Sequence, residues 1–83
     1  MARYNSFIID GEMYQVRHVR NSAFQTMKIY KCNRKNILCK RTLLAAPLLI
    51  DMMIEAQNTL DGKADNYYAR LAEFSIRKAI AKF

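Results

Sequence analysis

The sequence predicts an α+β fold, in which an antiparallel β-meander of three to four strands precedes a two-helix hairpin packed on one sheet face. Two observations support this: a strong hairpin signal interrupts a β-rich opening segment, and the apolar period lengthens to that of a helix after residue 42. Eighty-three residues suit one hydrophobic core. We therefore expect a single domain over residues 1–83, with a basic, β-rich half (1–42) and a helical half (43–83).

The first two strands are predicted on either side of the dipeptide Asp10-Gly11. Tyr4–Asp10 is short and rich in residues that favour strands, and Met13–Arg20 follows as its return strand. Asp-Gly is typical of a two-residue hairpin loop, because both central positions of that turn need a positive φ. The chain is therefore expected to open with a β-hairpin.

The third segment, Phe24–Cys32, allows two interpretations. Its β-branched and aromatic residues fit a strand, which we favour. Alternatively, Ser22 and Gln25 would form a capping box at the start of a helix. A turn is then predicted over residues 33–36, followed by a short fourth strand at Ile37–Arg41.

A first helix is predicted from about Ala46–Pro47 to Leu60. Proline suits the first helical position, where its missing N–H costs nothing, and Gly62 would end the helix. Ile50 and Ile54 add an apolar edge beside the main stripe, so the helix needs cover on more than one side. The stripe consists of Leu49, Met52, Met53, Ala56 and Leu60.

A second helix is predicted from Asn66 to about Lys82, capped by Asp65. On its polar side Glu73 lies three residues after Arg70 and four before Arg77, which allows ion pairs with both. The buried side is expected to hold Tyr68, Ala72, Ile76, Ala79, Ile80 and Phe83. The two helices would then pack together on the sheet.

The positive charge is confined to the first half of the chain. The formal net charge is +7, from 14 basic and 7 acidic residues. Residues 1–42 hold nine basic and two acidic side chains, whereas residues 43–83 hold five of each. Between Met13 and Ile50 there are eight basic residues and no acidic one. A stretch of one sign attracts anions, so we expect an acidic partner.

If Phe24–Cys32 is a strand, its alternation separates two faces. Met27 and Ile29 would meet the helices, and the other face would present aromatic rings beside lysine. Single-stranded nucleic acid needs this combination, because rings stack on bases while cations neutralise phosphates. We therefore predict a nucleic-acid-binding accessory protein, with RNA or single strands favoured. The expected contacts are Arg17, Arg20, Phe24, Lys28, Tyr30, Arg34, Lys35, Lys40 and Arg41.

A second hypothesis explains the same charge by a protein partner. The basic face would dock on an acidic host enzyme, such as a nuclease or a toxin, and act as an inhibitor or adaptor, alone or together with RNA. A very short, basic chain with few glycines and no cofactor motif looks like a small phage or mobile-element protein, many of which block host enzymes. The sequence leaves both hypotheses open.

We expect neither enzymatic activity nor a cofactor. His18 lies between Arg17 and Arg20, which suggests the general base of a ribonuclease. A general base also needs a second proton donor and an orienting partner, and the sequence does not identify either. Asp51 and Glu55 lie four apart on the first predicted helix, where they are expected to form its solvated edge rather than a metal site.

Cys32 and Cys39 are the only cysteines. A structural zinc needs four ligands, and two cysteines are too few for a disulfide framework. The sequence therefore predicts reduced, mostly buried thiols and no metal.

No membrane contact is expected. Met1–Asp10 lacks the apolar core of a secretory signal. The longest apolar run, Leu43–Ile50, is far shorter than the roughly 20 residues needed to cross a bilayer. We expect a soluble, cytoplasmic protein.

Self-association is expected because 52% of the residues are hydrophobic in a very short chain. With Ile50 and Ile54 exposed, a monomer would forgo about 1.5–3 kcal/mol for each. A homodimer through the first or the second helix would cover them. The predicted dimer interface contains Ile50, Met53, Ile54 and Phe83.

Overall fold

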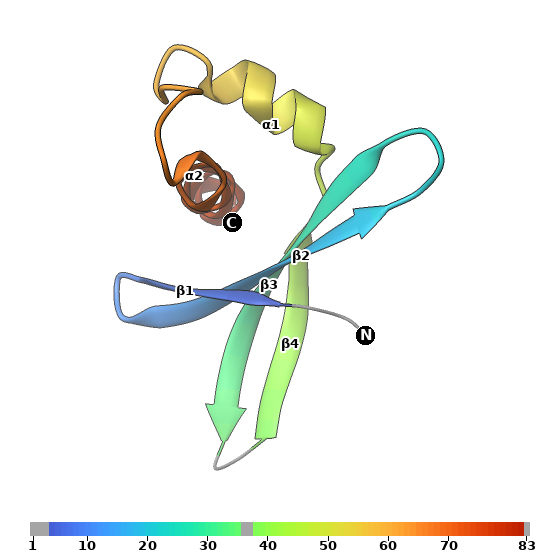
Figure 1. Cartoon of the computed structure of the whole chain (residues 1–83). Helices are drawn as coiled ribbons and strands as arrows, with labels where there is room; N and C mark the ends of the chain where they lie inside the picture. The colour runs from blue at the N-terminus through green and yellow to red at the C-terminus, as the bar shows by residue number, and fades with distance from the viewer. Residues whose placement is uncertain (1–3, 36–37, 83) are drawn as a thin grey trace.

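The computed structural model describes residues 4–35 and 38–82, with the backbone alone at positions 34, 35 and 38. Its elements are β1 (Asn5–Ile9), β2 (Glu12–Arg20), β3 (Gln25–Lys35), β4 (Leu38–Ala45), α1 (Leu49–Ala56) and α2 (Tyr67–Ala81). The strands form an antiparallel sheet in the order β1-β2-β3-β4. Both helices lie on the same side of this sheet (Figure 1). The predicted α+β meander with a helical pair on one face is confirmed.

Asp10 and Gly11 form the predicted turn between β1 and β2. Their φ angles are 52° and 80°, in the left-handed region that glycine adopts freely and aspartate tolerates. Ile9 pairs with Glu12, so the loop contains only these two residues. The hairpin prediction is confirmed.

The third segment is a strand rather than a helix. β3 pairs with β2 on one side and β4 on the other, so partners distant in sequence satisfy its backbone groups. The turn predicted over residues 33–36 is wrong, because β3 continues to Lys35. β4 likewise runs to Ala45, beyond the predicted end at Arg41. The predicted turn residue Asn36 and strand start Ile37 lie outside the described residues.

The first helix begins at Leu49 rather than at Ala46–Pro47. The Met27 amide donates to the Pro47 carbonyl oxygen over 2.8 Å, and Leu48 bridges to Thr26. The chain therefore remains paired with β3 through the proline and becomes helical only after it.

The same helix ends at Ala56, earlier than the predicted Leu60. The segment up to Leu60 continues as turns, and the Leu60 amide donates to the Ala56 carbonyl over 2.8 Å. Gly62 consequently lies in the loop before α2 and does not terminate α1. The apolar stripe is nevertheless correct, because Met52 and Ala56 are buried while Leu49, Met53 and Leu60 pack against the core.

The predicted cap and part of the predicted buried face of α2 are wrong. The capping position is Asn66, not Asp65, and the Asn66 side chain accepts a hydrogen bond from Arg70 Nε over 2.9 Å. Tyr68 is 62% exposed, and Tyr67 packs against the core in its place. The helix is rotated relative to the prediction so that Leu71 and Ser75 enter the core. The buried residues of α2 are Leu71, Ala72, Ser75, Ile76 and Ala79.

The core lies between the helices and the sheet, where Ser75 donates its hydroxyl to the Leu71 carbonyl over 2.8 Å. An ion pair between Glu55 and Lys78 joins the two helices at the surface. Within the described ranges, neither helix combines the length and apolarity of a membrane span. The largest side chains that are almost completely buried are Met27, Ile29, Leu71, Ile76 and Val16.

We predict that Ile76→Ala lowers the free energy of unfolding by about 2–5 kcal/mol, because Ile76 is fully buried and its loss leaves a cavity. The matched control is Ile8→Ala, which removes the same atoms from a side chain that is 66% exposed and should cost less than about 1 kcal/mol. Urea unfolding followed by circular dichroism measures both. Equal losses for the two variants would contradict this packing.

Candidate functional site

The sheet face away from the helices gathers the aromatic and basic side chains of three strands. Met27 and Ile29 are fully buried against the helices, so their neighbours Lys28 and Tyr30 project from the opposite face. We call this opposite side the open face. By strand register it includes Ile8, Met13, Gln15, Arg17, Thr26, Lys28, Tyr30, Arg41 and Leu43.

Four of the predicted contact residues share the open face. Arg17 on β2 lies directly opposite Lys28 on β3. Tyr30 lies between Gln15 on β2 and Leu43 on β4. Like charges opposite each other in a ladder repel, so an anion bound near Arg17 and Lys28 would relieve a cost of the folded sheet.

The fourth residue, Arg41, is held by a small network. Its guanidinium lies 3.9 Å from the centre of the Tyr4 ring, and its Nε donates to Gln15 Oε1 over 2.5 Å. The buried Gln15 side chain in turn donates to Ser6 Oγ over 3.1 Å. Tyr4 also meets Tyr30 edge to face, with centroids 5.7 Å apart. The cation and the two rings therefore form one cluster.

Tyr4 and Gln15 belong to this cluster but are not among the predicted contacts. The strand alternation that separated the two faces of β3 also applies to the first hairpin. Once the two-residue turn fixes the register, Ser6 lies opposite Gln15, and Gln15 lies opposite Tyr30. The missing information was the pairing of β2 with β3, which local sequence does not contain.

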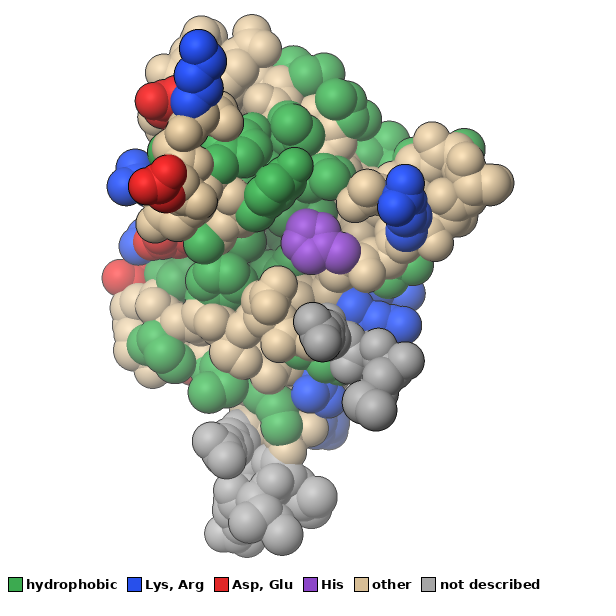
Figure 2. All heavy atoms as spheres, in the orientation of Figure 1, with side chains coloured by type: hydrophobic (Ala, Val, Ile, Leu, Met, Phe, Trp, Pro, Cys, Tyr) green, Lys and Arg blue, Asp and Glu red, His purple; other side chains and the backbone are tan. Residues whose placement is uncertain are grey.

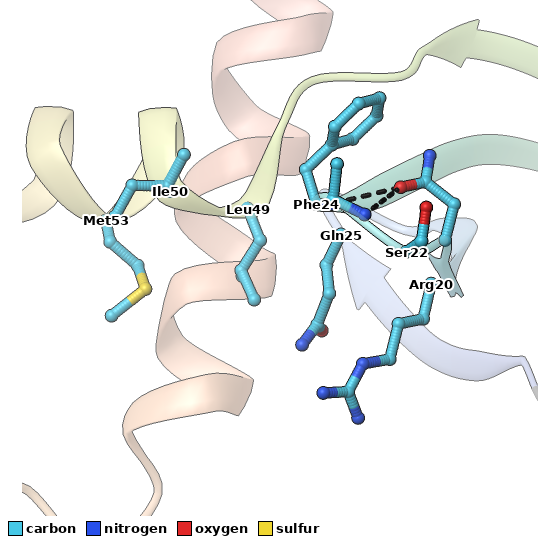
Figure 3. Close-up of a pocket in the computed structure, with 9 residues that line it drawn as sticks. Arg20, Ser22, Phe24, Gln25, Leu49, Ile50 and Met53 are labelled. Atoms are coloured by element: carbon cyan, nitrogen blue, oxygen red, sulfur yellow. Dashed lines mark hydrogen bonds between the residues drawn. The ribbon is translucent and has the colours of Figure 1, made fainter.

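Arg20 and Phe24 are not on the open face. Arg20 lies four residues after the core residue Val16, on the same face of the strand, and so projects from the helix side of β2. Phe24 was predicted to lie on the solvent face of a strand, but it precedes β3 in a loop. Asn21 Oδ1 shapes this loop by accepting hydrogen bonds from the amides of Ala23 and Phe24 over 2.9 and 3.0 Å (Figure 3).

Phe24 instead borders a hollow between the β2–β3 loop and α1. The volume of this hollow is about 460 Å³. Leu49, Ile50 and Met53 contribute from α1, as Figure 3 shows. The predicted contact Arg20 and the polar residues Asn21, Ser22 and Gln25 also line this hollow, but it shares no residue with the Tyr30 cluster and does not extend that surface.

The last three predicted contacts lie at the far end of β3 and β4. Lys40 is opposite Asn33 and projects from the other side of the hairpin than Arg41. The backbones of Arg34 and Lys35 belong to β3, but their side chains are outside the described part of the structure. The predicted dimer residue Phe83 also lies outside the described residues.

The prediction of reduced thiols is wrong. Cys32 and Cys39 form a disulfide that links β3 to β4, with Cα atoms 6.1 Å apart. Cys32 lies opposite Arg41, two residues after Cys39, so the cysteines are diagonal neighbours on the same face. The seven-residue spacing alone does not predict this bond, because the distance between the two Cα atoms depends on the register of β3 with β4.

Glu55 and His18 lie away from the open face. Glu55 pairs with Lys78 across the helices. The imidazole of His18 is beside apolar side chains on the helix side of the sheet (Figure 2), where it borders a hollow with Phe7 and Tyr68. Among the described residues, no three His, Cys, Asp or Glu side chains converge in a way that would hold a metal ion.

Comparisons of the chain with protein-family models, with curated proteins and with solved structures find no match. The arrangement of Arg17, Lys28, Tyr30 and Arg41 is therefore interpreted from its own geometry. Two cations on one side of Tyr30 and a fixed guanidinium on the other suit an elongated anion with planar groups.

We predict that Arg41→Met destabilises the fold by about 1 kcal/mol, because it leaves the buried Gln15 Oε1 without its donor. Lys40→Met is the matched control: it removes one positive charge from the neighbouring position, and we expect a change within about 0.5 kcal/mol. Chemical unfolding at matched ionic strength measures the difference. Equal losses of stability in the two variants would show that the hydrogen bond from Arg41 to Gln15 does not stabilise the fold.

Proposed function

We propose that this chain is a small nucleic-acid-binding accessory protein, without catalytic activity or a cofactor of its own, that binds RNA or single strands on its open face. The observation that carries the proposal is the position of Tyr30 between the Arg17–Lys28 pair and Arg41 on one sheet surface. Bases stack on the open part of the half-buried Tyr30 ring, and the basic side chains neutralise phosphates on either side.

Single strands fit this surface better than a duplex. Tyrosine rings on a sheet can reach bases only when those bases are unpaired and splayed out. Arg41 is already engaged by Tyr4 and Gln15, so its charge is oriented before a ligand arrives. Orientation in advance lowers the entropic cost of binding.

A second candidate function follows from apolar side chains on the same face. Ile8 and Leu43 are exposed on the open face beside the cations, and a mixture of apolar and cationic groups also suits a protein interface. In this alternative the protein is an inhibitor or adaptor that docks on an acidic host enzyme such as a nuclease or toxin, alone or together with RNA. Either function suits a phage or mobile-element protein in the cytoplasm.

Binding of short RNA and DNA oligonucleotides, measured by fluorescence anisotropy at low and moderate salt, tests the first proposal. We expect affinity to fall steeply with salt, because each neutralised phosphate releases counterions. Tyr30→Leu should weaken binding by about 1–3 kcal/mol through lost stacking. Lys28→Gln should weaken binding. It should also reduce the slope of log K against log salt by about 0.7, because one phosphate contact is lost.

The matched control is Lys63→Gln, which removes the same charge from the exposed loop between the helices and should leave binding almost unchanged. No oligonucleotide binding by the wild-type protein at low salt would overturn the proposal. Affinity purification with and without nuclease separates the two candidates: a partner protein that is retained after nuclease treatment favours the inhibitor or adaptor.

We also propose that the protein forms a homodimer through α1. Ile50 and Ile54 are 54% and 56% exposed. Ile50 borders the hollow beside Phe24, and both isoleucines border a second hollow of about 320 Å³ next to Leu60 and Tyr67. Exposed apolar side chains beside hollows can fit a second copy of the same surface about a twofold axis.

The charge distribution favours α1 over the open face of the sheet as the contact surface for a second copy. Residues 43–83 carry equal numbers of basic and acidic side chains, whereas residues 1–42 carry the whole net charge of +7. Contact through the helical half therefore keeps the two basic faces apart and limits repulsion between copies.

Light scattering at micromolar concentration should give about twice the 9.7 kDa chain mass. Ile54→Glu should yield the monomer, because a dimer would bury an unpaired carboxylate. Ile8→Glu introduces the same charge at an exposed position on the open face and should leave the dimer intact. A wild-type mass near 9.7 kDa would refute the assembly.

A further inference from the structure

The far end of the β3–β4 hairpin depends on few contacts. We call Lys31–Lys35 and Leu38–Thr42 the distal ribbon. The described pairing of β2 with β3 stops at Met13 and Cys32, so the ribbon beyond this point is paired only within itself. The β4 residues that pack against the core, Leu44 and Ala45, lie at the other end of the strand. Figure 1 shows the ribbon projecting away from both helices.

The ribbon also carries a high density of like charge. It contains no acidic residue and five basic ones: Lys31, Arg34, Lys35, Lys40 and Arg41. Glu12 approaches Lys31 to 4.0 Å, but only at the base of the ribbon. A two-stranded hairpin is only marginally stable in water, and repulsion between its cations lowers that stability further. Arg41 contacts Tyr4 and Gln15 at the base of the ribbon, but the part beyond it needs another interaction to keep its two strands paired.

The Cys32–Cys39 disulfide meets this requirement. It joins the two strands of the ribbon covalently on the open face. Cys32 lies opposite Arg41, and Cys39 directly precedes Lys40. A covalent link restricts the number of conformations that the open hairpin can adopt, and so favours the paired state. Cys32 is buried and Cys39 is partly exposed, so Cys39 provides the accessible sulfur.

We infer that this disulfide is a redox switch for the nucleic-acid site, an inference that rests on the proposed function. In the oxidised protein the ribbon is paired, and Arg41 on its open face is held in place for phosphates. In the reduced protein the ribbon opens, and part of the binding free energy is spent on ordering it again. A reducing cytoplasm would make such a bond transient, as in redox-sensing proteins.

The reductant is a dithiol. One of its thiolates attacks the accessible sulfur of Cys39, which breaks the Cys32–Cys39 bond and forms a mixed disulfide while Cys32 leaves as a thiolate and takes up a proton. The second thiol of the reductant then closes its own disulfide and releases Cys39 as a thiol. Two electrons and two protons pass to the protein in total.

The test compares the oxidised and dithiothreitol-reduced proteins, after thiol titration has established each state. Amide hydrogen exchange should show Asn33 and Lys40 losing protection on reduction, while Val16 and Ile29 in the core remain protected. Anisotropy with an oligouridylate should show weaker binding, with the slope of log K against log salt reduced by about 0.7 for each lost phosphate contact.

The control is a Cys32→Ser, Cys39→Ser double variant. It should resemble the reduced protein in both measurements and should not respond to dithiothreitol. An equal response of wild type and double variant would show that the reductant acts elsewhere and would overturn the inference.

The remaining outcomes separate the switch from the proposed function. If the ribbon keeps its protection after reduction, or if both redox forms bind equally, the inference fails while the proposed function stands. If neither form binds the oligonucleotide, the proposed function fails and the inferred regulation of the site fails with it. Two free thiols after air oxidation would refute the switch regardless of binding.

Discussion

The pairing of β3 with a strand on each side is the constraint on which the other features of this protein depend. Because β2 and β4 satisfy its backbone groups, β3 can place Met27 and Ile29 under the helices while Lys28 and Tyr30 project from the other face. One strand thus contributes both to the core and to the candidate site. The β3 backbone also holds the chain that leads into α1, because the Met27 amide donates a hydrogen bond to the Pro47 carbonyl oxygen.

The helices and the open face of this sheet carry differently arranged charges. The helices need apolar contacts on their inner face and tolerate mixed charge outside, as the Glu73–Arg77 and Glu55–Lys78 pairs show. The open face has Arg17 opposite Lys28, an arrangement that does not favour folding. A bound anionic ligand would offset the repulsion between these two cations. The same pair of charges therefore affects both the stability of the sheet and its proposed use.

Short-range patterns predicted much of the fold. The Asp10-Gly11 turn, the strand character of β3 and the buried stripe of α1 all depend on local propensity and periodicity. The errors occur where distant contacts override local preference. Pro47 suits a helix start but remains paired with β3, and Tyr68 fits the apolar period of α2 but faces solvent because the helix packs through Leu71 instead.

By itself, the sequence determined the order of the elements, the separation of charge between the two halves and the identity of Arg17, Lys28, Tyr30 and Arg41 as candidate contacts. These properties are encoded in composition and in spacings of a few residues. Only the tertiary structure decided which side chains meet. It placed Tyr4 and Gln15 beside Arg41, removed Phe24 from the sheet face and joined Cys32 to Cys39. Strand register sets the contacts of Gln15, Arg41 and the two cysteines. Apart from the two-residue turn of the first hairpin, this register is decided by how whole strands pair and pack, which no short sequence pattern records.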